Sequence, residues 1–224
     1  MATKNTEVIE IRPLEIKRVP VHIEGDTPLI MHAWSVKAKQ MMLDAQMGKA
    51  KGKQKPKKSP AEDFIESMYW LEGKPTIADS MSEEEKMAAF QAAIEAGARF
   101  GFPVTAFKQA AISAAYRMGW SKDKVSLRGA FFIESDDEGM IEIKSDPPAM
   151  REDMVRVGMG TADIRYRAQF DNWYADLTIV YNKNGQYSLD QIINMINVGG
   201  FACGVGEWRA EKGGTYGQFH VATV

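Results

Sequence analysis

The sequence predicts a single α+β domain over residues 1–224, built from an antiparallel sheet and packed helices. Three observations support this prediction. Short runs rich in β-branched and aromatic residues are typical of strands. Longer runs repeat apolar residues at helical spacing and follow serine capping motifs. Apolar residues make up 45% of the chain, yet no run is long enough to cross a membrane, which favours an ordinary core and no membrane partner.

The N-terminal part predicts one long and one short strand. The segment from Glu15 to Glu24 mixes β-branched and polar residues, as half-buried strands do. A Gly-Asp-Thr-Pro turn at residues 25–28 ends it, and the string LIMH at 29–32 follows as a short extended piece.

The net charge of −2 conceals two blocks of opposite sign. Residues 36–58 carry eight lysines and one acid, whereas residues 61–96 carry nine acids and two lysines. The string MGKAKGKQKPKKSP within the first block cannot bury enough apolar surface to fold alone. We expect either a solvated linker or a basic arm that tracks phosphates. Together with the helices that follow, it forms an insertion over residues 36–100.

Two capping motifs predict the helices of this insertion. Ser59-Pro60-Ala61-Glu62 places proline at the first helical position, and Ser82-Glu83-Glu84-Glu85 is a second capping box. Gly97 is placed to end the second helix. The residues expected to face the core are Phe64, Ile65, Met68 and Leu71 in the first helix and Met87, Phe90, Ala93 and Ile94 in the second.

The third helix has the strongest apolar period. Thr105 is expected to cap it and Gly119 to end it. Its core-facing stripe consists of Phe107, Ala110, Ala111, Ala114, Ala115 and Met118. Two strand-like runs follow, at 125–134 and 140–144, and the loop between them predicts a hairpin.

The last third of the chain predicts an extended hairpin, two strands and a helix. Residues Asp146 to Ala168 are expected to project from the body as an insertion, and Trp173 to Tyr181 reads as a strand. Ser188 caps a helix that Gly199-Gly200 is expected to close, and Tyr216 to Val224 forms the last strand. The inward residues of this helix are Leu189, Ile192, Ile193 and Ile196.

Without the insertions, the predicted order is strand, helix, strand, strand, helix, strand. This order is the split βαβ, ferredoxin-like arrangement, which RNA-recognition modules share. Its antiparallel sheet carries both helices on one face and leaves the other face free.

A glycine-rich string stands before the last strand. Seven glycines fall between Gly199 and Gly217, interleaved with Trp208, Arg209, Lys212 and Tyr216. Glycine permits positive φ and close backbone approach, and successive N–H groups in turns form anion sites. The string predicts either a mobile surface hairpin or a site for a ligand with phosphates and bases.

Three stretches together resemble the RAMP superfamily, and within it the crRNA-binding backbone subunit of CRISPR effector complexes. They are VHIEGDTPLIMH, a strand with a small-residue turn and Pro-Leu; GFPVTAFKQAAISAAYR, a proline-led helix with an early lysine; and GVGEWRAEKGGTYGQF, the most specific. The second stretch departs from the family's Pro-Gly-Ser-Ser-Leu-Lys-Gly pattern, because Val104, Thr105 and Ala106 replace its small residues. A relative encoded by a phage fits the resemblance as well as a CRISPR subunit does.

The resemblance implies a groove that holds single-stranded RNA by its backbone, and assembly of copies into a helical filament. The groove residues would be Lys108, Gly204, Gly206, Arg209, Lys212, Gly213 and Gly217. The insertion Asp146 to Ala168 would be the family's thumb, which touches the strand and the neighbouring subunit. Its cations are Arg151, Arg156, Arg165 and Arg167.

The same residues have plainer interpretations that stay open. Lys108 fits a solvated helix face. Arg165 and Arg167 share one strand face, so they either track phosphates or pair with Asp163 and Asp171. Trp208 is expected either to stack on a base or to contact a subunit, and Tyr216 is a second candidate for stacking.

Together these points predict a non-catalytic protein that binds single-stranded nucleic acid, RNA or DNA, and oligomerises along it in the cytoplasm of a bacterial cell. One alternative is a protein-interaction or inhibitor module. Another is a metal-independent endoribonuclease that uses His32 as its base. No P-loop, zinc or other cofactor motif is present in the sequence, so we expect no cofactor and no metal.

Overall fold

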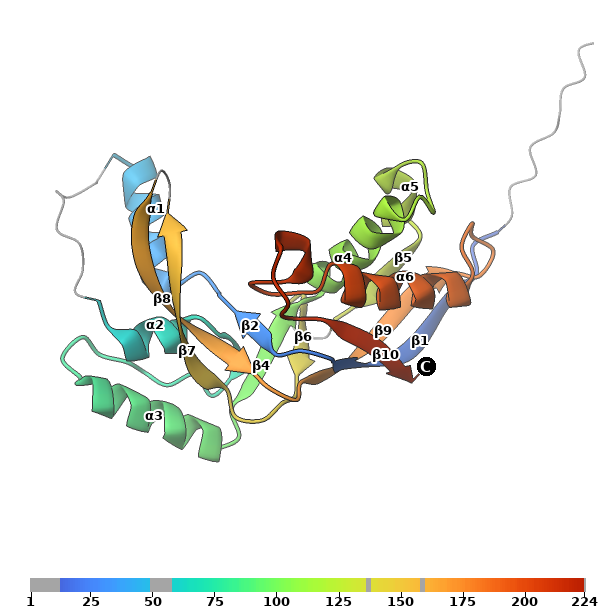
Figure 1. Ribbon diagram of the computed structural model, residues 1–224. Coiled ribbons are helices and arrows are strands. Elements are labelled where there is room, and N and C mark those ends of the chain that lie inside the picture. Colours follow the sequence, from blue (N-terminus) through green and yellow to red (C-terminus); the bar gives the residue numbers. More distant parts are fainter. Residues whose placement is uncertain (1–12, 49–57, 136–137, 158–159, 224) are drawn as a thin grey trace, which may run out of the picture.

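The computed structural model describes residues 13–48, 58–135, 138–157 and 160–223 and combines helices with three antiparallel sheets (Figure 1). This confirms the α+β class. Part of the lysine-rich string, residues 49–57, lies outside the described residues, as do residues 136–137 of the predicted hairpin loop. No helix in the described part of the chain is both long and apolar enough to cross a membrane.

The central sheet has the strand order β10-β1-β9-β5, and all neighbours are antiparallel. Two helices, α4 (Val104–Arg117) and α6 (Leu189–Ala202), pack together on one side of this sheet (Figure 1). Alternate residues of each strand, such as Val21 and Ile23, are buried beneath them. The strands are β1 (Ile16–Gly25), β5 (Phe131–Glu134), β9 (Tyr174–Asn182) and β10 (Phe219–Thr223).

Helix α4 confirms the predicted stripe but not its cap. Phe107 and the four alanines are buried, whereas Met118 is 53% exposed. Pro103 occupies the N-cap position and no side chain caps the helix, so the prediction that Thr105 is the cap is wrong. Proline fits here because it ends β4 and removes an N–H that would have no partner. Gly119 follows the helix end with φ of 73°, as expected.

Helix α6 begins at the predicted capping box, since Ser188 and Gln191 exchange side-chain and backbone hydrogen bonds. It does not end at Gly199-Gly200; the helix continues to Ala202. A Cβ on Gly199 would lie 2.6 Å from the Ala111 nitrogen, and one on Gly200 would lie 1.9 Å from the Phe219 oxygen. These glycines therefore let α6 approach α4 and β10 closely, which explains why they do not terminate the helix.

A second sheet contains the predicted extended hairpin. β7 (Ala149–Val157) and β8 (Thr161–Phe170) pair antiparallel over their whole length, and β2 (Leu29–Met31) adds to the base of β8. We call the β7–β8 hairpin the thumb. It stands at the opposite end of the molecule from α5 (Lys124–Arg128) (Figure 1).

A third sheet overturns one prediction. Its order is β3-β4-β6, with β3 (Tyr69–Glu72), β4 (Arg99–Pro103) and β6 (Met140–Ile143). The two runs expected to form a hairpin pair elsewhere: β5 joins β9, and β6 joins β4. Each finds its partner in a different sheet. Residues 124–128 form α5 rather than strand because Asp123 caps a short helix there.

Within the insertion over residues 36–100, the described residues form three helices, α1 (Val36–Gln46), α2 (Pro60–Glu66) and α3 (Glu83–Glu95). The capping box of α3 is present as predicted, and Ser59 caps α2. Helix α2 is shorter than predicted, because Met68 follows its end and Leu71 belongs to β3. Helix α1, which the lysine-rich pattern did not predict, has no buried residue.

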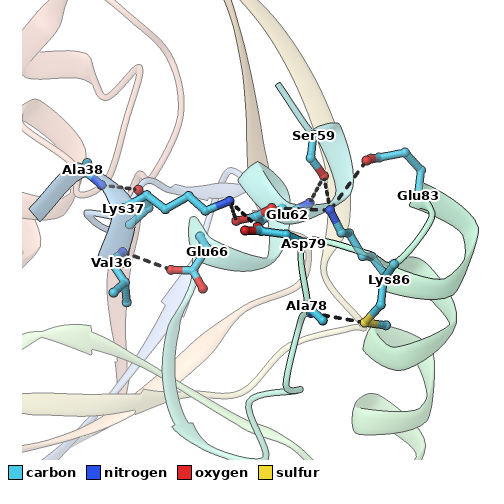
Figure 2. Close-up of polar contacts among 12 residues, drawn as sticks. Val36, Lys37, Ala38, Ser59, Glu62, Glu66, Ala78, Asp79, Glu83 and Lys86 are labelled. Atoms are coloured by element: carbon cyan, nitrogen blue, oxygen red, sulfur yellow. Dashed lines mark hydrogen bonds and ion pairs between the residues drawn. The ribbon is translucent and has the colours of Figure 1, made fainter. Parts of the chain in front are cut away.

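Polar contacts fix the start of α1 to the rest of the insertion (Figure 2). Lys37 Nζ lies 2.6 Å from Glu62 Oε1 and 3.0 Å from Asp79 Oδ1. Lys86, only 4% exposed, reaches Ser59 Oγ at 2.9 Å and so ties α3 to the start of α2. Polar side chains therefore join α1 to α2 and α2 to α3.

Aromatic rings join the sheets into one core. Phe100 of β4 meets Phe170 of β8 at 5.3 Å between centroids, which links the second and third sheets. Phe107 of α4 contacts Phe219 of β10 at 5.5 Å, and the buried Trp173 lies 6.0 Å from the same ring. Such offset and edge contacts stabilise cores beyond simple burial.

Candidate nucleic-acid interface

The glycine-rich string forms an ordered loop, which we call the glycine loop (residues 203–217), packed on the body of the protein. Val205 donates to the carbonyl of Gly217, and Gly217 donates to that of Pro28, both at 2.9 Å. Glu207 donates to the carbonyl of Ile30, also at 2.9 Å. The loop is therefore fixed between α6, β10 and the start of β2. A single 3-10 turn, η1 (Ala210–Lys212), lies within it.

The backbone conformation of this loop depends on its glycines. Gly204, Gly206, Gly213 and Gly217 all have positive φ, between 64° and 81°. The N–H groups of Gly204, Gly213 and Gly217 already donate to carbonyls of the chain. These three amides are therefore engaged and do not form the outward-facing amide cradle that the glycine content suggested.

Trp208 is the unusual residue of the glycine loop. Its φ of 51° lies in the left-handed region, where bulky residues are rare, and the residue is 39% exposed. The Trp208 carbonyl accepts a hydrogen bond from the Tyr216 amide at 3.1 Å, which fixes the backbone in this conformation. Such strain costs about 1–3 kcal/mol and is concentrated at functional sites.

The thumb turns one face toward the glycine loop. The Arg151 guanidinium lies 4.5 Å from the ring centroid of Tyr216, a cation–π contact between the two segments. On this face of the thumb, Arg151 of β7 pairs with Arg167 of β8, and Asp153 of β7 pairs with Arg165 of β8. The predicted pair Arg165 and Arg167 does share one face of the strand.

These arginines have partners within the protein. Arg165 Nε lies 2.7 Å from Asp163 Oδ2, as one of the two interpretations expected. Arg167 is 5% exposed and pairs with Asp153 at 3.2 Å rather than with Asp171. Its Nε has no hydrogen-bond partner among the described residues. Arg167 is thus a buried cation held by the thumb, and its surface is not open to a phosphate.

His32 lies between Arg167 of the thumb and Glu207 of the glycine loop. His32 Nδ1 lies 3.5 Å from Arg167 Nη2 and 3.9 Å from Glu207 Oε1. Burial, and next the Arg167 charge, lower the pKa of His32, so the imidazole is neutral near physiological pH. Glu207 reaches Arg167 only at 3.7 Å. The carboxylate therefore sits loosely beside the buried guanidinium.

The two cations of the glycine loop differ. Arg209 donates to Glu211 Oε2 from two nitrogens and to the Gly206 carbonyl from a third, so its guanidinium braces the loop. Lys212 is exposed and forms no ion pair within the described ranges. Of the two, Lys212 is the one free to meet an anion.

Lys108 lies apart from this region. Its ammonium group stands 4.0 Å from the centroid of the Phe132 ring on β5, and burial lowers its pKa. The residues of α4 that line a pocket together with residues of the glycine loop are instead Thr105, Ala106, Gln109 and Ala110. The structure therefore does not bring the predicted lysine to the predicted groove.

A pocket of about 340 Å³ opens where α4 begins. The first turn of α4 has neither a side-chain cap nor an acidic residue, and its Val104 amide donates to the Gly139 carbonyl at 2.9 Å; Thr105 and Ala106 of this turn line the pocket, so the positive end of the helix dipole lies beside it. The side chains and backbone that line it include His32, Tyr69, Thr105, Gln109, Gly204, Gly206, Glu207 and Arg209. A helix start of this kind favours an anion.

The free face of the central sheet carries polar and charged side chains that pair with one another. His22 Nδ1 lies 2.7 Å from Asp176 Oδ1, and Arg18 lies 3.1 Å from Glu134. Tyr174 is an exposed aromatic there, at 37%. A face whose polar side chains already pair with one another is a poor stacking platform, so the thumb and glycine loop form the better candidate interface.

No family model and no curated protein matches this chain. Among solved structures, it is similar to one described as the crystal structure of Cmr6 from Pyrococcus furiosus, with a TM-score of 0.34 and 11% identity. The alignment covers 93% of this chain and 100% of that one. At this TM-score and identity, the likeness establishes neither a family nor a function for the chain.

Proposed function

We propose that the protein binds single-stranded nucleic acid, without cleaving it, in the region between the thumb and the glycine loop. The observation that carries this proposal is Trp208, a partly exposed ring held at a strained backbone position. A fold that tolerates such strain for a surface tryptophan is better explained by a contact that the ring makes than by the stability of the loop.

Stacking supplies the sequence-tolerant part of this binding. Base–aromatic stacking contributes about 1–3 kcal/mol per base. The Tyr216 amide donates to the Trp208 carbonyl, so the backbones of these two aromatic residues are adjacent in the loop. Arg151 already stacks on Tyr216, and it would contact a base or phosphate beside that ring.

Cations and the positive end of a helix dipole supply the backbone contacts. Lys212 is exposed, and Arg165 uses only its Nε for Asp163, which leaves two terminal nitrogens without a partner among the described residues. The start of α4, which no side chain caps, lies at the neighbouring pocket and adds the positive end of its dipole. Glu207 and Glu211 also line this pocket and oppose an anion there, so we infer that the Glu207 side chain turns away when a phosphate enters.

We also infer a ferredoxin-like core and assembly of copies along the strand. The chain order β1, α4, β5, β9, α6, β10 and the sheet order β10-β1-β9-β5 support such a core. The RAMP resemblance of the sequence suggests the assembly. Exposed apolar residues on the thumb, Met154 at 78% and Met150 at 45%, would contribute to a subunit contact.

The test is purification at low salt, followed by size-exclusion chromatography before and after treatment with ribonuclease or deoxyribonuclease. We expect co-purifying nucleic acid, visible in the ultraviolet absorbance ratio, and a large particle that one nuclease reduces. The nuclease that acts identifies RNA or DNA. A small particle free of nucleic acid, together with no binding of labelled single strands, would contradict the proposal.

A second candidate function is a protein-interaction module, and helix α1 favours it. Trp34, Met41 and Leu43 are 60%, 60% and 47% exposed on or beside a helix without buried residues. Methionine-rich surfaces adapt readily to protein partners. Binding of a protein that persists at high salt without nucleic acid would favour this candidate.

The endoribonuclease alternative depends on His32. A neutral imidazole beside Arg167 has the protonation state of a general base. We propose binding without cleavage, and incubation of labelled RNA with the protein tests this directly. Cleavage that is lost in His32→Ala would overturn the non-catalytic part of the proposal.

A further inference from the structure

A second pocket, of about 470 Å³, lies on the other side of His32. It opens between α1, α2 and β8, whereas the pocket at the start of α4 lies toward the glycine loop. His32 lines both pockets, so the two are adjacent. A strand bound at the glycine loop would therefore pass directly from one to the other.

The walls of this second pocket are aromatic and apolar. Trp34, Met41 and Met42 line one side, and Tyr166 of β8 lines the other. Trp34 is 60% exposed, so its ring is not part of the core. A large flat ring open to solvent at the edge of a pocket is a surface on which a planar ligand stacks.

The pocket also holds one carboxylate without a partner. Asp63 lines it, and no hydrogen bond or ion pair to its carboxylate occurs among the described residues. Asp63 is exposed; partial burial raises its pKa, and the nearby charges of Lys58 and Arg165 act in the opposite direction. Glu66, the other acid of the pocket, is already engaged by Lys74 at 2.6 Å. Asp63 is therefore the acceptor that a ligand would meet.

The wall that carries Trp34 is held in place. The Val36 amide donates to Glu66 Oε2 at 3.3 Å, and Lys37 binds both Glu62 and Asp79 (Figure 2). These contacts anchor the first turn of α1 against α2. The stacking surface and the carboxylate thus belong to elements that are fixed relative to one another.

We propose that this pocket takes a guanine base of the bound strand, stacked on Trp34 and hydrogen-bonded to Asp63. This inference rests on the proposed nucleic-acid binding. Guanine presents two adjacent donors on its Watson–Crick edge, which match the two oxygens of a carboxylate. Adenine and cytosine present a donor beside an acceptor, and that acceptor would face the carboxylate. The terminal nitrogens of Arg165, which also lines the pocket, would hold the neighbouring phosphate.

The experiment compares three labelled strands of about 12 nucleotides. Each is a uridine tract whose central position is guanosine, inosine or uridine; inosine lacks only the 2-amino donor. Fluorescence anisotropy of the wild-type protein is expected to show about tenfold tighter binding of the guanosine strand than of the inosine strand. Equal affinity for all three strands would overturn the proposal.

Variants separate this pocket from the glycine loop. Asp63→Asn is expected to abolish the guanosine preference while binding of the uridine strand persists. Trp34→Ala is expected to weaken binding of the guanosine strand about tenfold. Trp120→Ala, which changes a 48% exposed tryptophan between α4 and α5, is the matched control and is expected to change nothing.

Two outcomes distinguish the failure of this inference from that of the proposed function. In the first outcome, Trp208→Ala weakens the binding of every strand, whereas Trp34→Ala and Asp63→Asn behave like the control. The guanine site is then wrong, and the proposed nucleic-acid binding stands. If the wild-type protein binds no strand, both proposals fail, and the pocket is then better assigned to a side chain of a protein partner.

Discussion

Replacement of Gly217 by alanine tests whether the glycine loop is fixed by close backbone packing. Gly217 has φ of 64°, and a Cβ at this position would lie 1.8 Å from the Val205 carbonyl oxygen. The Gly217 carbonyl also accepts the Val205 amide at 2.9 Å, so the two backbones cannot separate without loss of this hydrogen bond. The substitution therefore meets both a conformational and a steric penalty.

The two penalties have known sizes. A non-glycine residue in the left-handed region costs about 1–2 kcal/mol. Forcing an additional carbon into a packed region costs about 1–3 kcal/mol. Gly217→Ala is therefore expected to lower the free energy of unfolding by about 2–5 kcal/mol.

Gly213 provides a matched control within the same loop. Its φ is 81°, but no atom lies within 4 Å of a Cβ built there. Gly213→Ala should thus show the conformational penalty alone, about 1–2 kcal/mol. The difference between the two variants measures the packing of the glycine loop against the body.

The assay is urea unfolding followed by tryptophan fluorescence, with the free energy extrapolated to water for each variant. The buried Trp173 reports the core of the central sheet, which the glycine loop contacts. Equal losses for Gly217→Ala and Gly213→Ala would refute the close packing of this loop.

Three further predictions concern charges. Glu207→Gln removes the carboxylate beside Arg167 and is expected to tighten single-strand binding about two- to fivefold at low salt, or about 0.4–1 kcal/mol, measured by anisotropy; weaker binding would contradict the role of Glu207 as an opposing charge. Arg167→Met leaves the buried Asp153 with Arg151 alone, so urea unfolding should show a loss of about 3 kcal/mol, and a loss near zero would argue against this buried pair. The hydrogen bond and charge of Arg99 lower the pKa of Glu142 below 4.5 in the folded protein, so Glu142 contributes stability above that pH which is lost as the pH falls through its folded pKa. The pair is partly exposed, so the stability difference from Glu142→Gln should be under about 1 kcal/mol near neutral pH and vanish at low pH; a difference independent of pH would contradict this.

The sequence predicts best the elements whose signals are local. Helices α3 and α6 begin at their capping boxes, and α4 has the alanine stripe that its period predicted. A capping box satisfies helix amides through residues three positions apart, so it can be read without tertiary knowledge.

The predictions from sequence are wrong where contacts with distant segments determine the structure. Strands β5 and β6 look like a hairpin in sequence, but their partners are β9 and β4. Gly199 and Gly200 look like a helix end, yet α4 and β10 pack against them and the helix continues. Strand pairing and helix packing depend on contacts between segments far apart in the chain, which spacing alone does not contain.

The candidate site shows the same division. Its residue types are visible in the sequence, and Trp208 and Arg165 lie in the region expected for them. The burial and the partners of these residues cannot be read from the sequence: Arg167 is buried against Asp153, and the Lys108 ammonium group lies over the Phe132 ring. Trp34, which the sequence reading did not single out, lines a pocket only because α1 folds beside the thumb.

The most direct test of the central claim is an anisotropy titration of labelled single strands of about 12 nucleotides with the wild-type protein and with Trp208→Ala, repeated over a series of salt concentrations. The wild-type protein is expected to bind, with an affinity that falls steeply as salt increases, and Trp208→Ala is expected to bind about tenfold more weakly. Absence of binding at low salt, or equal affinity of the two proteins, would contradict the claim that the thumb and the glycine loop form a nucleic-acid interface.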